Sequence, residues 1–204
     1  MNKVKEICEL LDKNYPIEKC FLDYEKPHEL LVATILSAQC TDKRVNEITK
    51  TLFKKYRSVE DFASAKSSEL EDFIHSAGVY KNKAKNIISC CTRLIEGYGG
   101  VVPSDMEELT TLAGVGRKTA NVIRCHIFNI PSVIVDTHVK RVSRRLGLCV
   151  SENPDKIEFE LMAVLPEKHW IRWNAQIIKH GRAICKSQKP LCENCFLKNL
   201  CEYA

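Results

Sequence analysis

Lys118 stands in the stretch LAGVGRKTANV (residues 112–122), two positions after the second of two glycines. A lysine amine attacks an electrophilic carbon and forms a Schiff base only when it is neutral, and at an ordinary pKa of about 10.4 it is almost fully protonated at pH 7. The positive end of a helix dipole disfavours the ammonium, so the start of a helix suits a lysine nucleophile. The alternative is a solvated lysine that contacts a phosphate, and position alone favours that alternative.

The glycines ahead of this lysine predict a hairpin between two helices. Gly114 and Gly116 permit positive φ or the close approach of another backbone, and Val115 between them can enter the core. From Arg117 onward, with Thr119, the residues favour a new helix. The outward-pointing amides of such a turn and the helix dipole together form a site for a phosphate. A plain connection between two helices is the alternative.

Asp136 lies between an apolar run and a basic helix in the stretch VIVDTHVKRVSRRLG (residues 133–147). Aspartate is a preferred N-cap, and the helix expected over residues 137–146 is the one that it would cap. Capping is compatible with catalysis. A carboxylate in this place can therefore hold the helix end and also act on a substrate.

Four of the eleven cysteines crowd into the last twenty residues in the pattern Cys-x6-Cys-x2-Cys-x5-Cys. Four thiolates at such spacing can enclose one tetrahedral ion or one cubane, so both zinc and iron-sulfur are open. Charged and polar residues separate them, which argues against unrelated buried thiols. The four are Cys185, Cys192, Cys195 and Cys201. The other seven have apolar neighbours and are predicted to be packing residues, namely Cys8, Cys20, Cys40, Cys90, Cys91, Cys125 and Cys149.

Helices must position these groups, because apolar residues recur at spacings of three and four along the chain. Helix starts are predicted at Pro27, at Asp42, at Ser104 with Glu107 as a capping box, and at Asn153 before a proline. The stretch at residues 132–138 is the one place where a strand can be argued, and it is too short to build a sheet. The sequence therefore predicts an all-α protein of about ten short helices.

Composition limits the classes that remain. With 204 residues the chain can form one large domain or two small ones that share segments. No apolar run approaches the length of a membrane span, and the first residues lack the apolar region of a secretory signal. The net charge of +5 favours an anionic partner only mildly. We expect a protein of the cell interior, where thiols stay reduced.

Several stretches together resemble the endonuclease III family of helix-hairpin-helix DNA glycosylases. Besides the hairpin and the aspartate stretch, they are ELLVATILSAQCTDKRVN (29–46), AGVYKNKAKNI (77–87), HGRAICKSQKPLCENC (180–195) and LCEYA (200–204), which span nearly the whole chain. The resemblance implies a two-lobed all-α architecture with a C-terminal iron-sulfur cluster loop. One lobe, residues 21–130, contains the helix-hairpin-helix, and the other combines residues 1–20 with 131–204 and carries the cluster.

The resemblance also assigns roles to residues. It implies that Lys118 forms a covalent intermediate, that Asp136 supports base excision, and that the four clustered cysteines bind a [4Fe-4S] cluster. The hairpin from Gly114 to Thr119 would grip one DNA strand. Side chains must fill the gap that a flipped nucleotide leaves in the duplex. The remaining DNA contacts implied by family position are Gln39 and Val79 as gap-filling residues, Lys186 and Lys189 in a basic loop, and His138. Val79 is shorter than the leucine familiar at its position.

The function that the resemblance implies is a DNA glycosylase with AP lyase activity. It would excise oxidised pyrimidines from duplex DNA, cleave at abasic sites by β-elimination, and work as a monomer in the cytoplasm of a prokaryote. One alternative is a monofunctional adenine or mismatch glycosylase of the same superfamily, although those branches usually lack the hairpin lysine. The other is a non-catalytic DNA-binding iron-sulfur module, against which the pairing of Lys118 with Asp136 argues.

Overall fold

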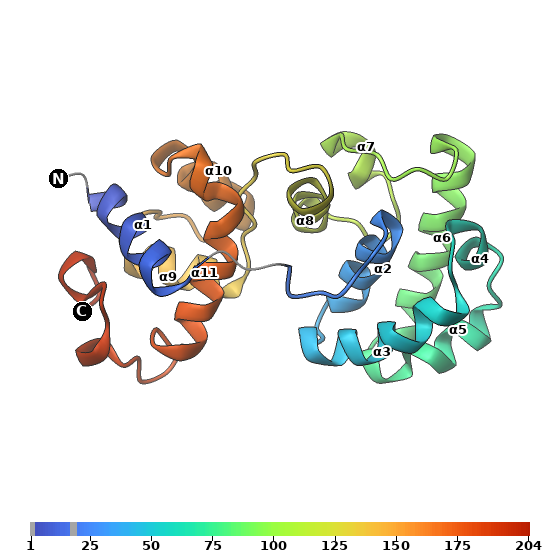
Figure 1. Cartoon of the computed structure of the whole chain (residues 1–204), viewed down its shortest axis with the longest axis horizontal. Helices are drawn as coiled ribbons and strands as arrows, with labels where there is room; N and C mark the ends of the chain where they lie inside the picture. Colours follow the sequence, from blue (N-terminus) through green and yellow to red (C-terminus); the bar gives the residue numbers. More distant parts are fainter. Residues whose placement is uncertain (1–2, 17–19) are drawn as a thin grey trace. The chain divides into compact units, whose positions relative to one another are not determined.

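The computed structural model describes residues 3–16 and 20–204. Residues 1–2 and 17–19, which belong to the N-terminal segment expected in the cluster-bearing lobe, lie outside the described residues. Helices account for all the regular structure described, which confirms the predicted all-α class (Figure 1). None of the helices in the described ranges is long and apolar enough to cross a membrane.

The helices are short and follow one another closely. The α-helices are α1 (Lys3–Asn14), α2 (Pro27–Ser37), α3 (Asp42–Lys55), α4 (Val59–Ala63), α5 (Ser67–Ile74), α6 (Tyr80–Tyr98), α7 (Met106–Thr110), α8 (Arg117–Ile127), α9 (Thr137–Arg145), α10 (Pro154–Val164) and α11 (Trp170–Ala183). Short 3₁₀ helices are η1 (His75–Ala77), η2 (Glu167–His169), η3 (Cys192–Asn194) and η4 (Lys198–Leu200).

Contacts between residues divide the chain into two compact units. The first unit combines residues 1–19 with 130–204, and the second is residues 20–129. Helices α2 to α8 belong to the second unit, which therefore contains the predicted hairpin. Helix α1 joins α9, α10, α11 and the cysteine-rich segment in the first. Each unit has a separate apolar core.

Most predicted helix starts are confirmed, and one is wrong. Helices begin at Pro27, at Asp42 and after Asn153, whose side chain caps α10 by accepting from the amide of Asp155 at 2.9 Å. The capping box of Ser104 and Glu107 does not form. Asp105 caps α7 instead, because its carboxylate accepts from the amides of both Glu107 and Glu108. Aspartate and serine are both good caps, and the pattern placed the helix start one residue early.

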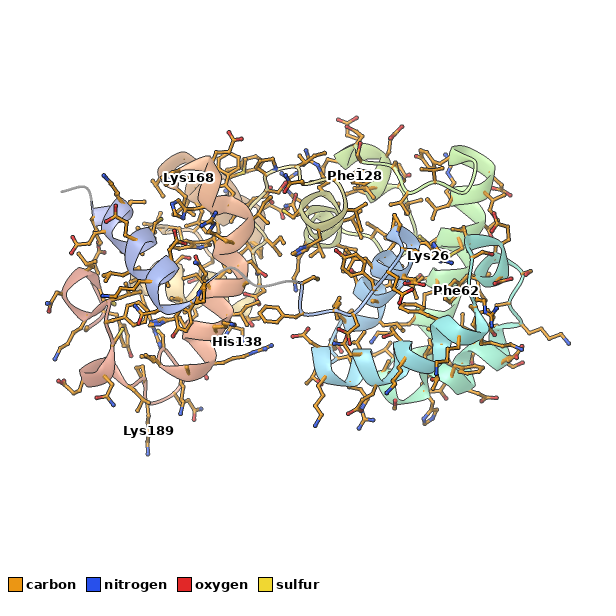
Figure 2. All side chains as sticks on the ribbon, viewed as in Figure 1. Lys26, Phe62, Phe128, His138, Lys168 and Lys189 are labelled. Atoms are coloured by element: carbon orange, nitrogen blue, oxygen red, sulfur yellow. The ribbon has the colours of Figure 1, made fainter. Side chains whose placement is uncertain are left out.

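The core of the second unit is built around α6, which packs against α4 and α5. Phe62 of α4 is fully buried, and its ring stacks on that of Tyr56 with a centroid separation of 5.1 Å. The ring of Phe53 meets the ring of Phe62 edge-on. Figure 2 shows Phe62 among the helices of this unit. This aromatic group fixes the side of the unit formed by α3, α4 and α5.

In the first unit, α11 runs through the core and holds both α1 and α9. Trp173 is fully buried, and its indole donates to the hydroxyl of Ser143 in α9 at 3.3 Å. On another face of α11, Gln176 and Arg172 both donate to the carboxylate of Asp12 in α1. The N-terminal helix is therefore tied to the helices that follow residue 130 by polar bonds as well as by apolar packing.

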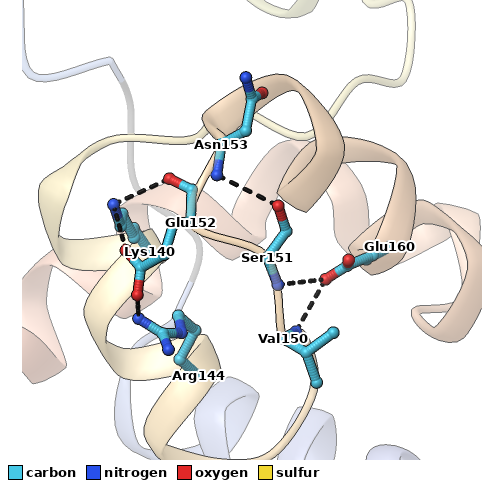
Figure 3. Close-up of polar contacts among 7 residues, drawn as sticks. All are labelled: Lys140, Arg144, Val150, Ser151, Glu152, Asn153 and Glu160. Carbon is cyan, nitrogen blue, oxygen red and sulfur yellow. Dashed lines mark hydrogen bonds and ion pairs between the residues drawn. The ribbon is translucent and has the colours of Figure 1, made fainter.

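A polar network fixes the connection between α9 and α10 (Figure 3). The carboxylate of Glu160 accepts from the amides of Val150 and Ser151 at 2.8 and 3.2 Å. Lys140 of α9 donates to the main chain of Glu152 and also pairs with its carboxylate, which Arg144 contacts too. The network satisfies loop amides that have no helical partner and holds α9 in place.

The seven cysteines outside the C-terminal cluster are packing residues, as the sequence predicts. Five are buried, and burial raises the pKa of the Cys8 thiol to about 11 and that of Cys90 to about 12. Cys20 and Cys40 are half-buried and pack against the edge of the core of the second unit, although both lie outside the helices.

The aromatic group generates the first testable prediction. Phe62→Ala should lower the free energy of unfolding by about 3–5 kcal/mol, because it leaves a cavity beneath Tyr56 and Phe53. Val150→Ala is the control, since that side chain is 84% exposed and the change should cost about 0.5 kcal/mol or less. Urea denaturation followed by circular dichroism measures both. Equal midpoints for the two variants would contradict the packing described.

Candidate active site and DNA interface

The predicted hairpin joins α7 to α8 within the second unit. Helix α7 ends at Thr110, and a turn follows in which the amide of Val115 donates to the carbonyl of Leu112 at 3.1 Å. Both of these side chains are buried in the core of the unit. The turn is thus anchored from within at two apolar positions. The main chain on either side of Val115 is left at the surface.

The two glycines of the hairpin serve different purposes. Gly114 has φ of +79°, and a Cβ atom there would meet Asn86 of α6 at 3.1 Å and Ile35 of α2 at 3.3 Å. It is needed for a left-handed turn in a tight space. Gly116 has an extended backbone with φ of −93° and caps α8, and a Cβ atom there would meet nothing within 4 Å. Its lack of a side chain leaves room for an approaching partner.

The first turn of α8 presents Lys118 at the surface. Gly116 is the N-cap, and the first helical bond runs from the amide of Ala120 to the carbonyl of Gly116 at 2.9 Å. The amides of the residues before Ala120 have no acceptor one turn earlier in the helix. They lie at the N-terminal end of the helix, where the helix dipole is positive. Arg117 and Thr119 flank the lysine and are half-exposed, whereas Lys118 is exposed. The geometry suits an anion at the main chain and an accessible amine beside it.

Asp136 caps α9 in the first unit, as the sequence predicts. One carboxylate oxygen, Oδ1, accepts from the amide of Val139 at 2.8 Å. The three residues before it, 133–135, belong to no helix and are buried, so the aspartate follows a segment that is held in the core. The side chain is half-buried. A carboxylate held at both its main chain and its side chain has a defined direction.

The basic side chains of α9 are largely engaged by the protein itself. Lys140 and Arg144 bind Glu152. Arg141 donates to the carbonyls of Gly181 and Cys185 at the end of α11. The run of cations after Asp136 is therefore mainly structural, which its sequence alone does not reveal.

His138 is half-buried rather than solvated. Its Nδ1 lies 3.2 Å from the guanidinium of Arg141. A Cβ atom at Gly181 would come within 2.7 Å of the same nitrogen, so α9 and α11 approach closely here. The imidazole is part of the contact between these two helices.

The four C-terminal cysteines line one pocket in the first unit. All four are half-buried, and none forms a disulfide. Burial, together with the neighbouring thiols, raises the pKa of Cys195. Among the residues described, no three possible ligands are close enough to hold a single metal ion. The four cysteine side chains therefore line the same pocket without converging on the position of a single metal ion.

Arg145 at the end of α9 fixes the cysteine-rich segment. Its guanidinium donates to the sulfur of Cys185 at 3.3 Å and to the carbonyls of Lys186 and Ser187 at 2.7 and 3.1 Å. It also lies over the ring of Tyr203, 4.3 Å from the centroid. Sequence reasoning missed this residue. Its spacing of four from Arg141, which places both on one helix face, was the available signal.

Lys186 and Lys189 lie in the exposed loop between Cys185 and Cys192. Lys189 has a left-handed backbone with φ of +49°. Figure 2 shows its side chain pointing away from the ribbon. The carbonyls that Arg145 holds belong to this loop, so the loop is fixed at its base while its lysines remain at the surface.

Gln39 and Val79 are both exposed, and both have a left-handed backbone, with φ of +54° and +46°. Gln39 follows α2, and Val79 directly precedes α6. This conformation is uncommon outside glycine and is strained for a β-branched residue such as valine. Strain of this kind gathers at functional sites. Nothing in the sequence signals it at position 79.

Comparison with known proteins bears on the whole chain. Residues 32–167 match the HhH-GPD superfamily of base excision DNA repair proteins. An endonuclease III of Synechocystis is 50% identical over 203 residues, which cover 99% of this chain and 93% of that protein. The chain belongs to the endonuclease III family. It is a base excision repair enzyme that acts on DNA, a glycosylase with AP lyase activity.

Solved structures agree with this assignment. A trapped covalent intermediate of endonuclease III with DNA matches with a TM-score of 0.93 and 44% identity, covering 100% of this chain and 97% of that one. A thermostable thymine-DNA glycosylase matches with a TM-score of 0.88 at 24% identity, covering 98% and 96%. The second likeness shows the shared fold alone.

The cap on α9 gives a prediction that separates the hydrogen bond of the cap from the charge of the carboxylate. Asp136→Ala should lower the free energy of unfolding by about 1 kcal/mol, because the amide of Val139 loses its acceptor. Asp136→Asn keeps an oxygen that can cap and should differ from the parent by only about a few tenths of a kcal/mol. Thermal or urea unfolding of the three proteins tests this. Equal loss in both variants would show that the carboxylate charge, and not the cap, stabilises the helix.

Proposed function

We propose that this enzyme excises oxidised pyrimidines from duplex DNA and then nicks the strand, with Lys118 as the nucleophile. The observation that carries the proposal is the exposed amine of Lys118 in the first turn of the hairpin helix, beside amides that suit a DNA phosphate. The relative at 44% identity was trapped as a covalent intermediate with DNA, which supports covalent chemistry in this family member as well.

In the first step the neutral amine of Lys118 attacks C1′ of the damaged nucleotide. A bond forms between the amine nitrogen and C1′, and the bond from C1′ to the base breaks. The bonding electrons leave with the base, which takes up a proton. The nitrogen loses a proton, and its lone pair then forms a double bond to C1′. The bond from C1′ to the ring oxygen breaks, and the oxygen keeps the electron pair and takes up a proton. The product is an imine that links Lys118 to the sugar.

The imine makes the second step possible because it acidifies the proton on C2′. Loss of that proton forms a double bond between C2′ and C3′. The bond from C3′ to its phosphate oxygen breaks, and the phosphate leaves with the electron pair. This β-elimination cuts the strand on the 3′ side of the lesion. An abasic site, which has already lost its base, joins the same route when its C1′ forms the imine with Lys118.

Asp136 has an electrostatic role in this scheme. As the base departs, positive charge develops on the sugar, and a nearby carboxylate stabilises it. The carboxylate of Asp136 is oriented by its bond to the amide of Val139, so little reorganisation is needed when the charge appears. Capping and catalysis then use the same side chain in one orientation.

The remaining surface groups are assigned to DNA binding. The hairpin from Gly114 to Thr119 would hold a phosphate through main-chain amides. Lys186 and Lys189 supply positive charge to the backbone from their exposed loop. Gln39 and Val79 would fill the space left by the extruded nucleotide. His138 is the weakest of these assignments, because its imidazole also packs between α9 and α11.

The cysteine pocket fits a [4Fe-4S] cluster. Four thiols line a single space, as a cubane requires, and thiolates are the ligands of such clusters. Cys185, Cys192, Cys195 and Cys201 would hold it. When bound, the cluster would supply a covalent junction among the four cysteine positions. This chain's own part is to present four sulfur donors and to fix the lysine loop from its base through Arg145.

The relatives, which include bacterial endonuclease III proteins, support a place of action in a bacterial cell. We propose a monomer that works on chromosomal DNA in the bacterial cytoplasm. A monofunctional glycosylase would need no covalent lysine. The accessible amine of Lys118 supports the proposed function over that alternative.

Borohydride trapping tests the nucleophile. Mixing the enzyme with duplex DNA that holds one thymine glycol, and adding borohydride, should produce a cross-linked band. Lys118→Ala should abolish the band and lower the rate of strand nicking by at least about a thousandfold, because the amine takes part in both steps. Gel electrophoresis under denaturing conditions measures both products.

Lys168→Ala is the control, because this lysine is also exposed but lies outside the proposed interface. It should give a band of parental intensity. A band that survives Lys118→Ala would place the nucleophile elsewhere, and active parental enzyme without any band would indicate a monofunctional glycosylase.

Iron and sulfide analysis tests the cofactor. The purified protein should contain about four irons and four acid-labile sulfides per chain, with the visible absorbance of thiolate-to-iron charge transfer. Cys192→Ser should reduce both contents. Cys20→Ser, at a cysteine of comparable exposure outside the motif, should leave them unchanged. A bound zinc ion in place of iron would refute the cluster assignment.

A further inference from the structure

Lys83 is a buried cation in the second unit. It lies in the first turn of α6, and only 5% of the residue is exposed. Its ammonium donates to two main-chain carbonyls, those of Leu36 and Ala77, each at 2.8 Å. These acceptors belong to segments far apart in the sequence. One is at the end of α2, and the other is the last residue of η1.

Both segments lead directly into the strained residues of the site. Leu36 precedes Gln39 by three positions, and Ala77 precedes Val79 by two. Each strained residue has a left-handed backbone and is exposed. One side chain therefore bridges the two places from which the proposed gap-filling residues project.

The ammonium of Lys83 contributes more to fixing the positions of these two main-chain segments than to stabilising the fold. The carbonyls at a helix C-terminus lack intrahelical partners, and a cation there is favourable. Burial nevertheless disfavours the charged form and lowers the pKa of Lys83. The net stability that the ammonium contributes is therefore the gain from its two hydrogen bonds less the cost of burying its charge. What the ammonium adds is a fixed distance between two main-chain segments.

We infer that Lys83 is a positioning residue for base extrusion, which fixes the main chain of the two segments that carry Gln39 and Val79. The inference rests on the proposed function, in which these two side chains occupy the gap in the duplex. Left-handed backbone at non-glycine residues persists only where the surroundings hold it. Valine is also a short side chain, so its reach depends on where the main chain is held.

Two DNA substrates separate extrusion from chemistry. One is a fully paired duplex with a single thymine glycol. The other carries the same strand on a complement that leaves the lesion and its neighbours unpaired, so that less stacking opposes extrusion. Single-turnover excision is measured on both with Lys83→Met, which keeps an unbranched side chain that is one heavy atom shorter and removes the charge and the donors. Lys85→Met is the matched control, since Lys85 lies two positions along α6 and is exposed.

Lys83→Met should slow excision from the paired duplex about tenfold or more, and from the unpaired substrate by less than about threefold, because misplacement affects extrusion and leaves the nucleophile intact. Lys85→Met should change both rates by the same factor. Equal factors for Lys83→Met on the two substrates would overturn the inference. Absence of parental activity on both substrates would instead reject the proposed function.

A fluorescent readout reports extrusion itself. With 2-aminopurine placed opposite the lesion, opening of the pair raises fluorescence, and Lys83→Met should lower the amplitude at saturating enzyme relative to Lys85→Met. If Lys83→Met does not unfold cooperatively, Lys83→Arg replaces it. The planar guanidinium cannot place one nitrogen at the ammonium position, so a smaller selective loss is expected. A parental ratio of paired to unpaired rates in folded Lys83→Arg would also overturn the inference.

Discussion

The ends of helices leave amides and carbonyls without intrahelical partners, and this constraint organises the functional surface of the protein. At the start of α8, glycine leaves the amides open to a ligand, whereas at the start of α9 the carboxylate of Asp136 satisfies one of them. At the end of α2 the unsatisfied carbonyl is met by the ammonium of Lys83. Each of these groups therefore stands where the main chain itself leaves an amide or a carbonyl without a helical partner.

Sequence reasoning succeeded where the signal was local. The hairpin glycines, the cap at Asp136 and the helix start at Asn153 all depend on residues within one turn of each other, and the structure shows each of them. The cluster of four cysteines could also be recognised from the sequence, because the spacing between its members is short. Local chemistry of this kind does not need knowledge of the fold.

Contacts between residues far apart in the sequence could not be predicted from local patterns. Arg145 appears in sequence as one cation in a basic helix, yet its partners lie about forty residues later, in the loop after Cys185. Lys83 likewise appears as one of several lysines in α6, and its burial becomes visible only when α2 is placed beside it. The left-handed backbone at Val79 has no local signal either, because valine is among the residues least suited to it.

The backbone at position 79 has a consequence for attempts to make such an enzyme more robust. A search that scores variants by thermal tolerance alone favours glycine or asparagine there, since both accept positive φ at lower cost. Either replacement exchanges an apolar, branched surface for a smaller or polar one at a site that is 55% exposed. With Val79 in the proposed gap-filling role, selection for heat resistance and selection for repair would draw this single residue in opposite directions.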